Sequence, residues 1–155
     1  MAAPNPSLEF VRLEKLIRAG LPSIVMITGD SDFFRGKAME RLLKAVPADA
    51  ELRNVDGVDH KVAGDDDDSG AEGAVLAPEL QDLRGGGLFA RTSFVAVRRG
   101  GNWWKKHSAS IAQLASKIPS GSGLLLESAK LDKRKKVAAT LVKQLVASGA
   151  VFEFR

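Results

Sequence analysis

The chain contains no cysteine in its 155 residues. Disulfide bonds and thiolate-ligated metal sites are therefore excluded, and this composition is typical of proteins in a reducing cytoplasm. Histidine is scarce too, because His60 and His107 are its two occurrences. Neither histidine has a nucleophile or a metal-binding partner at a suggestive spacing, and no pair of acids can be placed together. We therefore expect no catalysis and no bound metal or cofactor.

Long apolar runs are also missing. No stretch approaches the roughly 18 uninterrupted apolar residues that a membrane span needs. The amino-terminal MAAPNPSLEF has neither the basic nor the apolar region of a secretory signal. Apolar residues make up 45% and charged residues 27% of the chain, which is the balance of a globular protein. We expect one folded domain over residues 1–155, in the cytoplasm and without membrane contact.

Charge is distributed unevenly along the chain. Residues 83–155 carry 14 basic and 3 acidic side chains, whereas residues 49–82 carry 2 basic and 11 acidic ones. The stretch 57–74 contains GDDDDSGAEG, which repels itself and has little to bury, so we expect a mobile acidic loop. Consecutive aspartates lack the alternate ligand spacing of a calcium loop. The positive carboxyl-terminal half can attract a polyanion or an acidic protein, or it can serve solubility alone.

Short apolar runs alternate with amphipathic segments along the chain. Strands are expected at 23–28, 50–56, 93–97, 123–127 and 150–154. Helices are expected from Ser7 to Ala19, from Ser31 or Asp32 onward, over 77–83, over 103–118, and around Val137, Leu141 and Leu145. This alternation predicts an α/β fold with three layers, in which helices cover both faces of a parallel sheet of about five strands.

Two adjacent tryptophans open the helix expected at 103–118. Trp104 falls on an apolar stripe that continues through His107, Ile111, Leu114 and Ile118. Trp103 cannot share that stripe, because consecutive residues of a helix point in different directions. We expect Trp103 to be exposed, where it could stack on a nucleic-acid base.

The turn after the first expected strand matches a phosphate-binding loop in outline only. Such a loop has the pattern Gly-x4-Gly-Lys-Ser/Thr, whose amides and lysine hold phosphates and whose hydroxyl holds Mg²⁺. Here six residues, two of them aspartates, separate Gly29 from Gly36, and Ala38 stands at the hydroxyl position. The strand that should end in a metal-holding acid runs into Arg98 and Arg99 instead. The sequence predicts a degenerate nucleotide site.

Three stretches together resemble one family. They are PSIVMITGDSDFFRGKAMERLL (22–43), LRGGGLFARTSFVAVRR (83–99) and LLLESAKLDKRKKVAATLVKQLVASGAVFEF (124–154). The third is the most specific, and the match extends over residues 8–155. The chain resembles the N-terminal domain of the delta subunit of bacterial DNA polymerase III, a clamp-loader component. This resemblance implies an AAA+-like fold whose nucleotide site is lost. It also implies a non-catalytic accessory subunit of the DNA-directed DNA polymerase (nucleotidyltransferase) holoenzyme.

The resemblance also implies a partner and a contact. Delta subunits bind the ring-shaped sliding clamp, the beta subunit, and let the ring be opened for loading on primed DNA. Their contact is an apolar pair, and Leu88 and Phe89 fall at the matching positions. Three glycines precede the pair where the family has one small residue, and glycine would let it reach a partner. From the residue pattern alone, burial of the pair against the domain's own sheet remains open.

A run of cations forms a second candidate surface. Its members are Lys130, Lys133, Arg134, Lys135 and Lys136. Cations in the first turn of a helix oppose its dipole by about 0.3–1 kcal/mol each, which favours a role other than helix stability. DNA, held through the assembled loader, or another clamp-loader subunit could be the partner, and a solvated helix face is the alternative.

Some features of the family are missing, and two other functions stay open. The lid and collar domains of delta subunits have no counterpart in this sequence, so we expect it to be an excised domain. One alternative is an ATP-binding P-loop NTPase, which would bind ATP with Mg²⁺. The other is a general nucleic-acid-binding domain, whose DNA affinity would depend steeply on salt.

Overall fold

Continuous apolar runs form the strands of one parallel sheet. The computed structural model describes residues 5–59, 78–81, 83 and 92–154. Its strands are β1 (Ile24–Thr28), β2 (Glu51–Asp56), β3 (Ser93–Arg98), β4 (Gly123–Glu127) and β5 (Val151–Glu153). They lie in the order β2-β3-β4-β1-β5, and every pairing is parallel. The expected five-stranded parallel sheet is confirmed.

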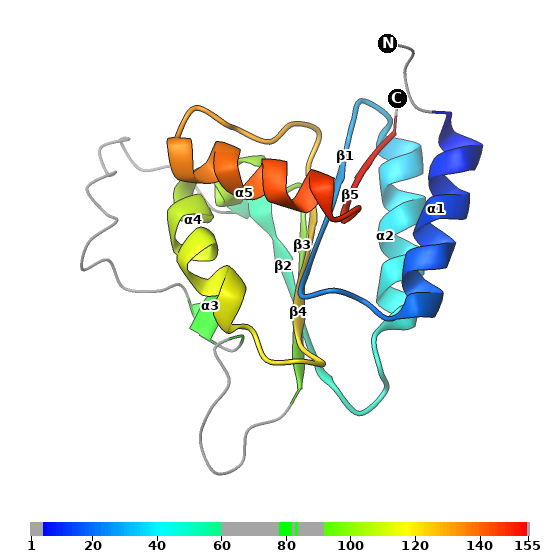
Figure 1. Ribbon diagram of the computed structural model, residues 1–155, viewed down its shortest axis with the longest axis horizontal. Helices are drawn as coiled ribbons and strands as arrows, with labels where there is room; N and C mark the ends of the chain where they lie inside the picture. The colour runs from blue at the N-terminus through cyan, green and yellow to red at the C-terminus, as the bar shows by residue number, and fades with distance from the viewer. Residues whose placement is uncertain (1–4, 60–77, 82, 84–91, 155) are drawn as a thin grey trace.

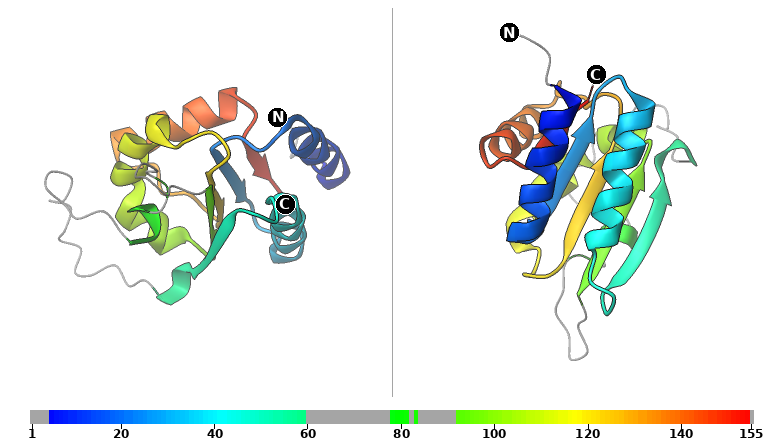
Figure 2. Two further views of the ribbon diagram at one scale, coloured as in Figure 1. Left: turned by 90° about the horizontal axis from the view of Figure 1, so that it is seen from below. Right: turned by 90° about the vertical axis from the view of Figure 1, so that its right-hand side faces the viewer.

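Helices cover both faces of the sheet (Figures 1 and 2). The helices α1 (Pro6–Ala19) and α2 (Asp32–Ala45) lie side by side on one face. On the other face lie α3 (Pro78–Gln81), α4 (Gly101–Leu114) and α5 (Lys136–Ala147). Two short 3-10 turns, η1 (Gly57–Asp59) and η3 (Ala115–Lys117), complete the described elements. No helix in the described ranges has the length and apolar character to cross a membrane.

Coverage on both faces explains the strand sequences. All five residues of β4 and four of the five in β1 are buried, because successive side chains point into opposite layers. Val25 and Ile27 pack with α1 and α2, whereas Ile24 and Met26 pack with the layer of α4 and α5. The strand β2 has no buried residue, as expected for a strand at the edge of the sheet.

The structure corrects the expectation for Trp103. Both Trp103 and Trp104 are 0% exposed. The helix α4 contacts η1 and α5, and Leu80 in α3 and Leu83 just after α3 belong to the same core. A helix with partners on several sides buries a wide arc, so two residues about 100° apart can both be internal. Trp103 is therefore a core residue in this structure, with no face open to a nucleic-acid base.

The predicted cap residue is confirmed for α2 and was wrong for α1. Ser31 caps α2, since its Oγ accepts a hydrogen bond from the Phe34 amide at 3.1 Å. The helix α1 begins one residue before the expected cap Ser7, at Pro6. Asn5 is its cap, and its Oδ1 accepts a hydrogen bond from the Ser7 amide at 2.8 Å. Asn and Ser cap helices equally well, which is why the pattern did not separate them.

Candidate functional site

Two backbone amides of the turn between β1 and α2 are hydrogen-bonded within the protein. The Gly29 amide donates to the Ala129 carbonyl at 3.2 Å, and the Ser31 amide donates to the Phe154 carbonyl at 3.2 Å. A Cβ on Gly29 would lie 2.0 Å from that Phe154 oxygen, so the chain after β5 packs directly on the turn. Phosphate-binding loops work through amides that face the ligand. These amides are already paired within the protein.

A buried ion pair lies beside the same turn. Arg35 on α2 and Glu127 at the end of β4 are each 6% exposed, and their side chains pair. Arg35 also pairs with Asp32 in the first turn of α2. Glu127 Oε1 accepts a further hydrogen bond from the Arg99 amide at 3.1 Å. This carboxylate therefore joins α2, β4 and the segment after β3, and the nearby cation is neutralised internally.

The two arginines at the end of β3 have a structural partner or lie in solvent. Arg99 pairs with Asp56 at the end of β2, and Arg98 is exposed. The pKa of Asp56 lies below its usual value, first because the Val58 amide donates to it and then because Arg99 is close. The 57–74 segment thus starts with η1 packed against α4, while residues 60–74 lie outside the described residues.

We predict that the chain does not bind Mg-ATP. The amides of Gly29 and Ser31 are paired within the protein, Gly29 packs against Phe154, and the position of a metal-holding acid is taken by Arg98 and Arg99. Isothermal titration of the chain with Mg-ATP should give no heat of binding. A dissociation constant in the micromolar range would contradict this reading of the turn.

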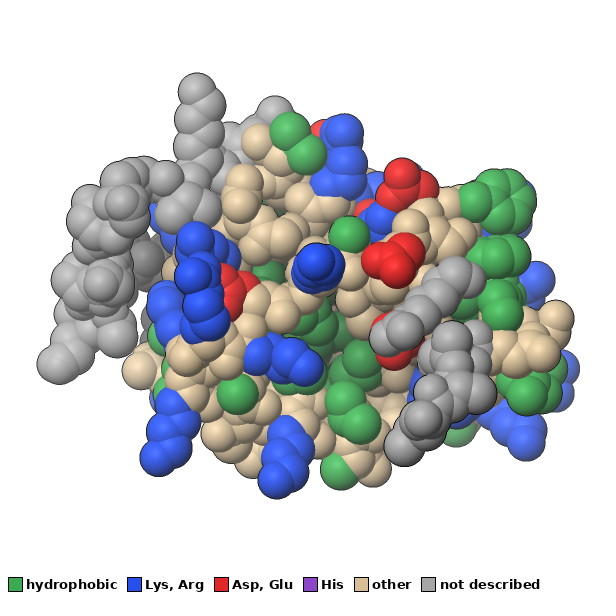
Figure 3. Space-filling model, turned by 90° about the horizontal axis from the view of Figure 1, so that it is seen from above, with side chains coloured by type: hydrophobic (Ala, Val, Ile, Leu, Met, Phe, Trp, Pro, Cys, Tyr) green, Lys and Arg blue, Asp and Glu red, His purple; other side chains and the backbone are tan. Residues whose placement is uncertain are grey.

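The run of cations has a different setting from the one expected. The helix α5 begins at Lys136, with Lys135 as its cap residue. Lys130, Lys133 and Arg134 therefore precede the helix and lie in the loop after β4, so they do not occupy its first turn. All five cations are exposed. Figure 3 shows basic side chains gathered on the half of the molecule that contains α4 and α5.

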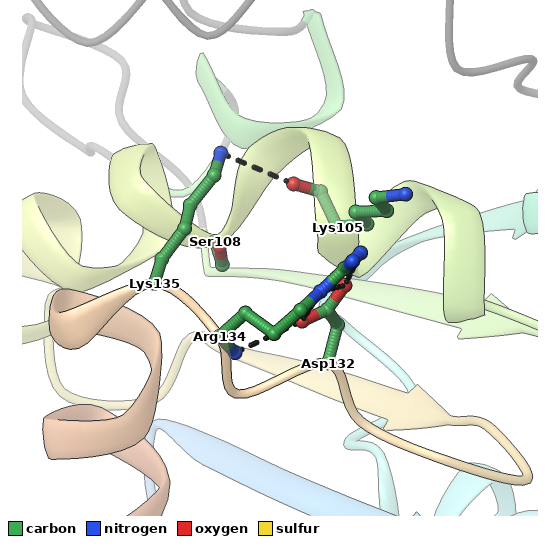
Figure 4. A pocket seen from close by; sticks show the side chains of 5 residues that line it. All are labelled: Lys105, Ser108, Asp132, Arg134 and Lys135. Atoms are coloured by element: carbon green, nitrogen blue, oxygen red, sulfur yellow. Dashed lines mark hydrogen bonds and ion pairs between the residues drawn. The ribbon is translucent and has the colours of Figure 1, made fainter. Parts of the chain in front are cut away.

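Part of this loop borders a cavity of about 310 Å³ next to α4 (Figure 4). Its lining residues are Lys105 and Ser108 from α4, and Asp132, Arg134 and Lys135 from the loop. Of the five cations predicted as a site, Arg134 and Lys135 line this cavity. Lys105 and Ser108 were not foreseen as site residues, although their spacing of three on one helix places them on one face.

Asp132 organises the loop. Its carboxylate accepts from the Arg134 side chain, with Arg134 Nη2 and Asp132 Oδ2 2.7 Å apart, and from the Arg134 amide at 2.9 Å. These bonds lower the pKa of Asp132 to about 2, the side-chain bond contributing most. The Asp132 carbonyl accepts from Trp104 Nε1 at 2.8 Å, which fastens the loop to the core side of α4.

Leu88 and Phe89 lie outside the described residues. The residues that flank their segment are described, and both ends are fixed. Leu83 is fully buried in the core. At the other end the Thr92 carbonyl accepts from the Glu51 amide at 3.0 Å, and the Ser93 amide donates to Ser122 Oγ at 2.9 Å. β3 starts at Ser93, so this end of the segment lies at the amino-terminal ends of the parallel strands. The β1–α2 turn lies at their carboxyl-terminal ends.

No protein-family model matches the sequence, and no curated protein matches it. Among solved structures, the DNA clamp loader delta protein (YqeN) of Bacillus subtilis is similar, with a TM-score of 0.60 at 15% identity. The likeness covers 94% of this chain and 42% of that protein, so the chain spans less than half of its length. At this identity the likeness concerns the fold. The chain has the α/β fold found in part of a clamp loader delta protein.

Proposed function

We propose that this chain is the clamp-binding domain of a clamp-loader delta subunit, a non-catalytic accessory protein of DNA replication. The observation that carries the proposal is the fold shared with a clamp loader delta protein over 94% of the chain. The occupied amides of the β1–α2 turn support it, because a binding subunit with this fold needs no nucleotide of its own. The DNA polymerase III context follows from the sequence resemblance.

Leu88 and Phe89 are the proposed contact with the sliding clamp. Burial of one such side chain in a partner's pocket contributes about 1.5–3 kcal/mol. Their segment is held at both ends, by buried Leu83 and by the bonds of Thr92 and Ser93. Binding residues are commonly carried on loops that a rigid scaffold positions. In the proposed function the subunit binds the clamp and opens the ring for loading on primed DNA, and it meets DNA and the other loader subunits in the assembled loader.

A general nucleic-acid-binding function is the second candidate. It is favoured by the exposed cations on the half of the molecule with α4 and α5. Binding of that kind is dominated by phosphate contacts, so its affinity falls steeply as salt rises. An apolar clamp contact would depend weakly on salt, which separates the two functions in one salt series.

Retention on immobilised sliding clamp from the same organism tests the proposed function. The chain should be retained at about 50 mM salt and still be retained at about 200 mM salt. Over this range the affinity of a complex that is held by phosphate contacts falls by about three to five orders of magnitude. Circular dichroism of the same sample establishes that it is folded. A folded chain that passes through the clamp column unretained contradicts the proposal.

A further inference from the structure

The sheet has two outer strands, β5 and β2, and side chains of α1 occupy the free edge of β5. The Glu153 amide donates to Glu9 Oε2 at 3.0 Å, and Arg12 Nη2 donates to the Val151 carbonyl at 2.7 Å. Arg12 Nη1 also donates to the Gly149 carbonyl at 3.1 Å. Outward backbone groups of β5 are therefore engaged within the chain, which hinders the pairing of another strand there.

The strand β2 forms the opposite edge of the sheet, as the right-hand view of Figure 2 shows. The Glu51 amide donates to the Thr92 carbonyl at 3.0 Å, so the backbone of Glu51 faces β3. Backbone groups alternate in direction along a strand, so those of Leu52 and Asn54 face away from β3. These are the groups with which an added strand would pair.

The composition of β2 allows such pairing. The strand has six residues, ELRNVD, with neither proline nor glycine, and its first four residues are exposed. Leu52 among them is 41% exposed. Prolines, bulges and very short strands are devices by which proteins keep edges unpaired, and charged side chains are another. Glu51 and Arg53 supply charges, so the charge of an incoming strand decides whether it can pair.

The charges of β2 are complementary to those of an antiparallel second copy. Directly opposite residues in an antiparallel pair are both hydrogen-bonded or both not, so a two-fold axis passes through a residue of the strand. With the axis at Leu52, Glu51 of each copy lies opposite Arg53 of the other copy, and the two leucine side chains meet. With the axis at Arg53 the two guanidinium groups oppose each other. With the axis at Asn54, Arg53 lies opposite Val55 of the other copy.

We propose that β2 is a self-association surface, to which a second copy of this chain adds its own β2 in antiparallel orientation with Leu52 on the two-fold axis. Each Leu52 then exchanges two backbone hydrogen bonds with Leu52 of the other copy, and two Glu51–Arg53 pairs form across the axis. Opposite charges and apolar side chains that lie directly opposite each other stabilise antiparallel strands. A contact of one strand from each copy is small, so the dimer is weak and depends on concentration. The assignment does not depend on clamp binding.

Sedimentation equilibrium of the whole chain, at concentrations up to about 1 mM, tests for the dimer. Salt at about 0.15 M screens the repulsion between two chains of net charge +4. The chain should show a monomer–dimer equilibrium, and a chain that stays monomeric overturns the proposal. Amide hydrogen exchange at Leu52 and Asn54 should slow as concentration rises, because these amides become hydrogen-bonded. A dimer that leaves exchange at Leu52 unchanged uses another surface and overturns the proposal too.

Reversal of charge at either position tests the register. Glu51→Arg and Arg53→Glu each turn both cross-strand pairs into like-charge pairs, so the dissociation constant should rise about tenfold or more. In an equal mixture of the two variants every pair again joins opposite charges, and association should recover. Each variant keeps its altered contacts within its own chain in the mixture, so recovery comes from pairs between copies.

A matched control accompanies the two variants. Lys143→Glu makes the same charge change as Arg53→Glu, on the exposed side of α5, and should leave the dissociation constant unchanged. Circular dichroism should show that all three variants are folded, because the replaced side chains are exposed. A mixture that does not recover, or a Lys143→Glu variant that dissociates as readily as Arg53→Glu, overturns the proposal.

Discussion

Replacement of Leu88 and Phe89 together by serine should weaken sliding-clamp binding by about two to four orders of magnitude. Each apolar side chain that is buried in a partner contributes about 1.5–3 kcal/mol, and about 1.4 kcal/mol corresponds to a factor of ten in affinity. Central apolar residues also dominate many interfaces. The melting temperature should not change, because the proposed contact lies outside the domain's own core. Clamp affinity and thermal unfolding are measured on the same double variant.

A second leucine–phenylalanine pair provides the matched control. Leu8 on α1 is 67% exposed and Phe33 on α2 is 66% exposed, so serine is tolerated at both. The Leu8→Ser/Phe33→Ser variant loses the same side chains and should bind the clamp as the unchanged chain does. If the Leu88/Phe89 variant instead unfolds several kcal/mol more easily, the pair packs in the core, as large-to-small core substitutions behave. That outcome would contradict the assignment of Leu88 and Phe89 as the clamp contact.

Replacement of Glu127 by alanine should lower the free energy of unfolding by about 3–5 kcal/mol. The substitution leaves the Arg35 guanidinium buried without its carboxylate partner, and an unpaired buried charge is costly. It also removes the acceptor of the Arg99 amide. Urea denaturation of the variant, followed by circular dichroism, gives the change. A loss below about 1 kcal/mol would contradict the role given to the pair.

Two further variants separate the buried pair from its exposed neighbour. Asp32 contacts the same guanidinium, but its side chain is 94% exposed. Asp32→Asn should therefore cost no more than about 1 kcal/mol, as exposed ion pairs do. The double variant Arg35→Met/Glu127→Leu should recover most of the loss, because apolar residues of similar volume can replace a buried pair. Failure of the double variant to recover would assign the loss to the packing around β4.

The order of strands and helices could be predicted from the sequence, because the burial of each strand on both faces leaves a continuous apolar run. Runs such as IVMIT and GLLLE are apolar up to their last residue, and layers of helices on both faces of a sheet require such runs. The prediction that Trp103 is exposed was wrong, because helical periodicity does not reveal how many elements surround a helix. The start of α5 was also misplaced, since LDKRKK lacks a capping residue at the true boundary, Lys135.

The candidate sites were less accessible from the sequence. Glu127 ends an apolar strand, and that contrast was a signal for a buried charge, but its partner Arg35 lies 92 positions away. The cavity joins Ser108 on α4 to a loop that follows β4, and no periodicity connects the two segments. Arg134 and Lys135 were singled out by charge density alone. Leu88 and Phe89 rest on the family resemblance and stay a prediction.

Isothermal titration of the intact chain with the sliding clamp of the same organism tests the central claim most directly. The claim is that a domain without a nucleotide site binds the clamp by itself. The account predicts saturable binding with one dissociation constant, unchanged when Mg-ATP is added. No binding by a folded chain, or a dissociation constant that shifts with Mg-ATP, would contradict it.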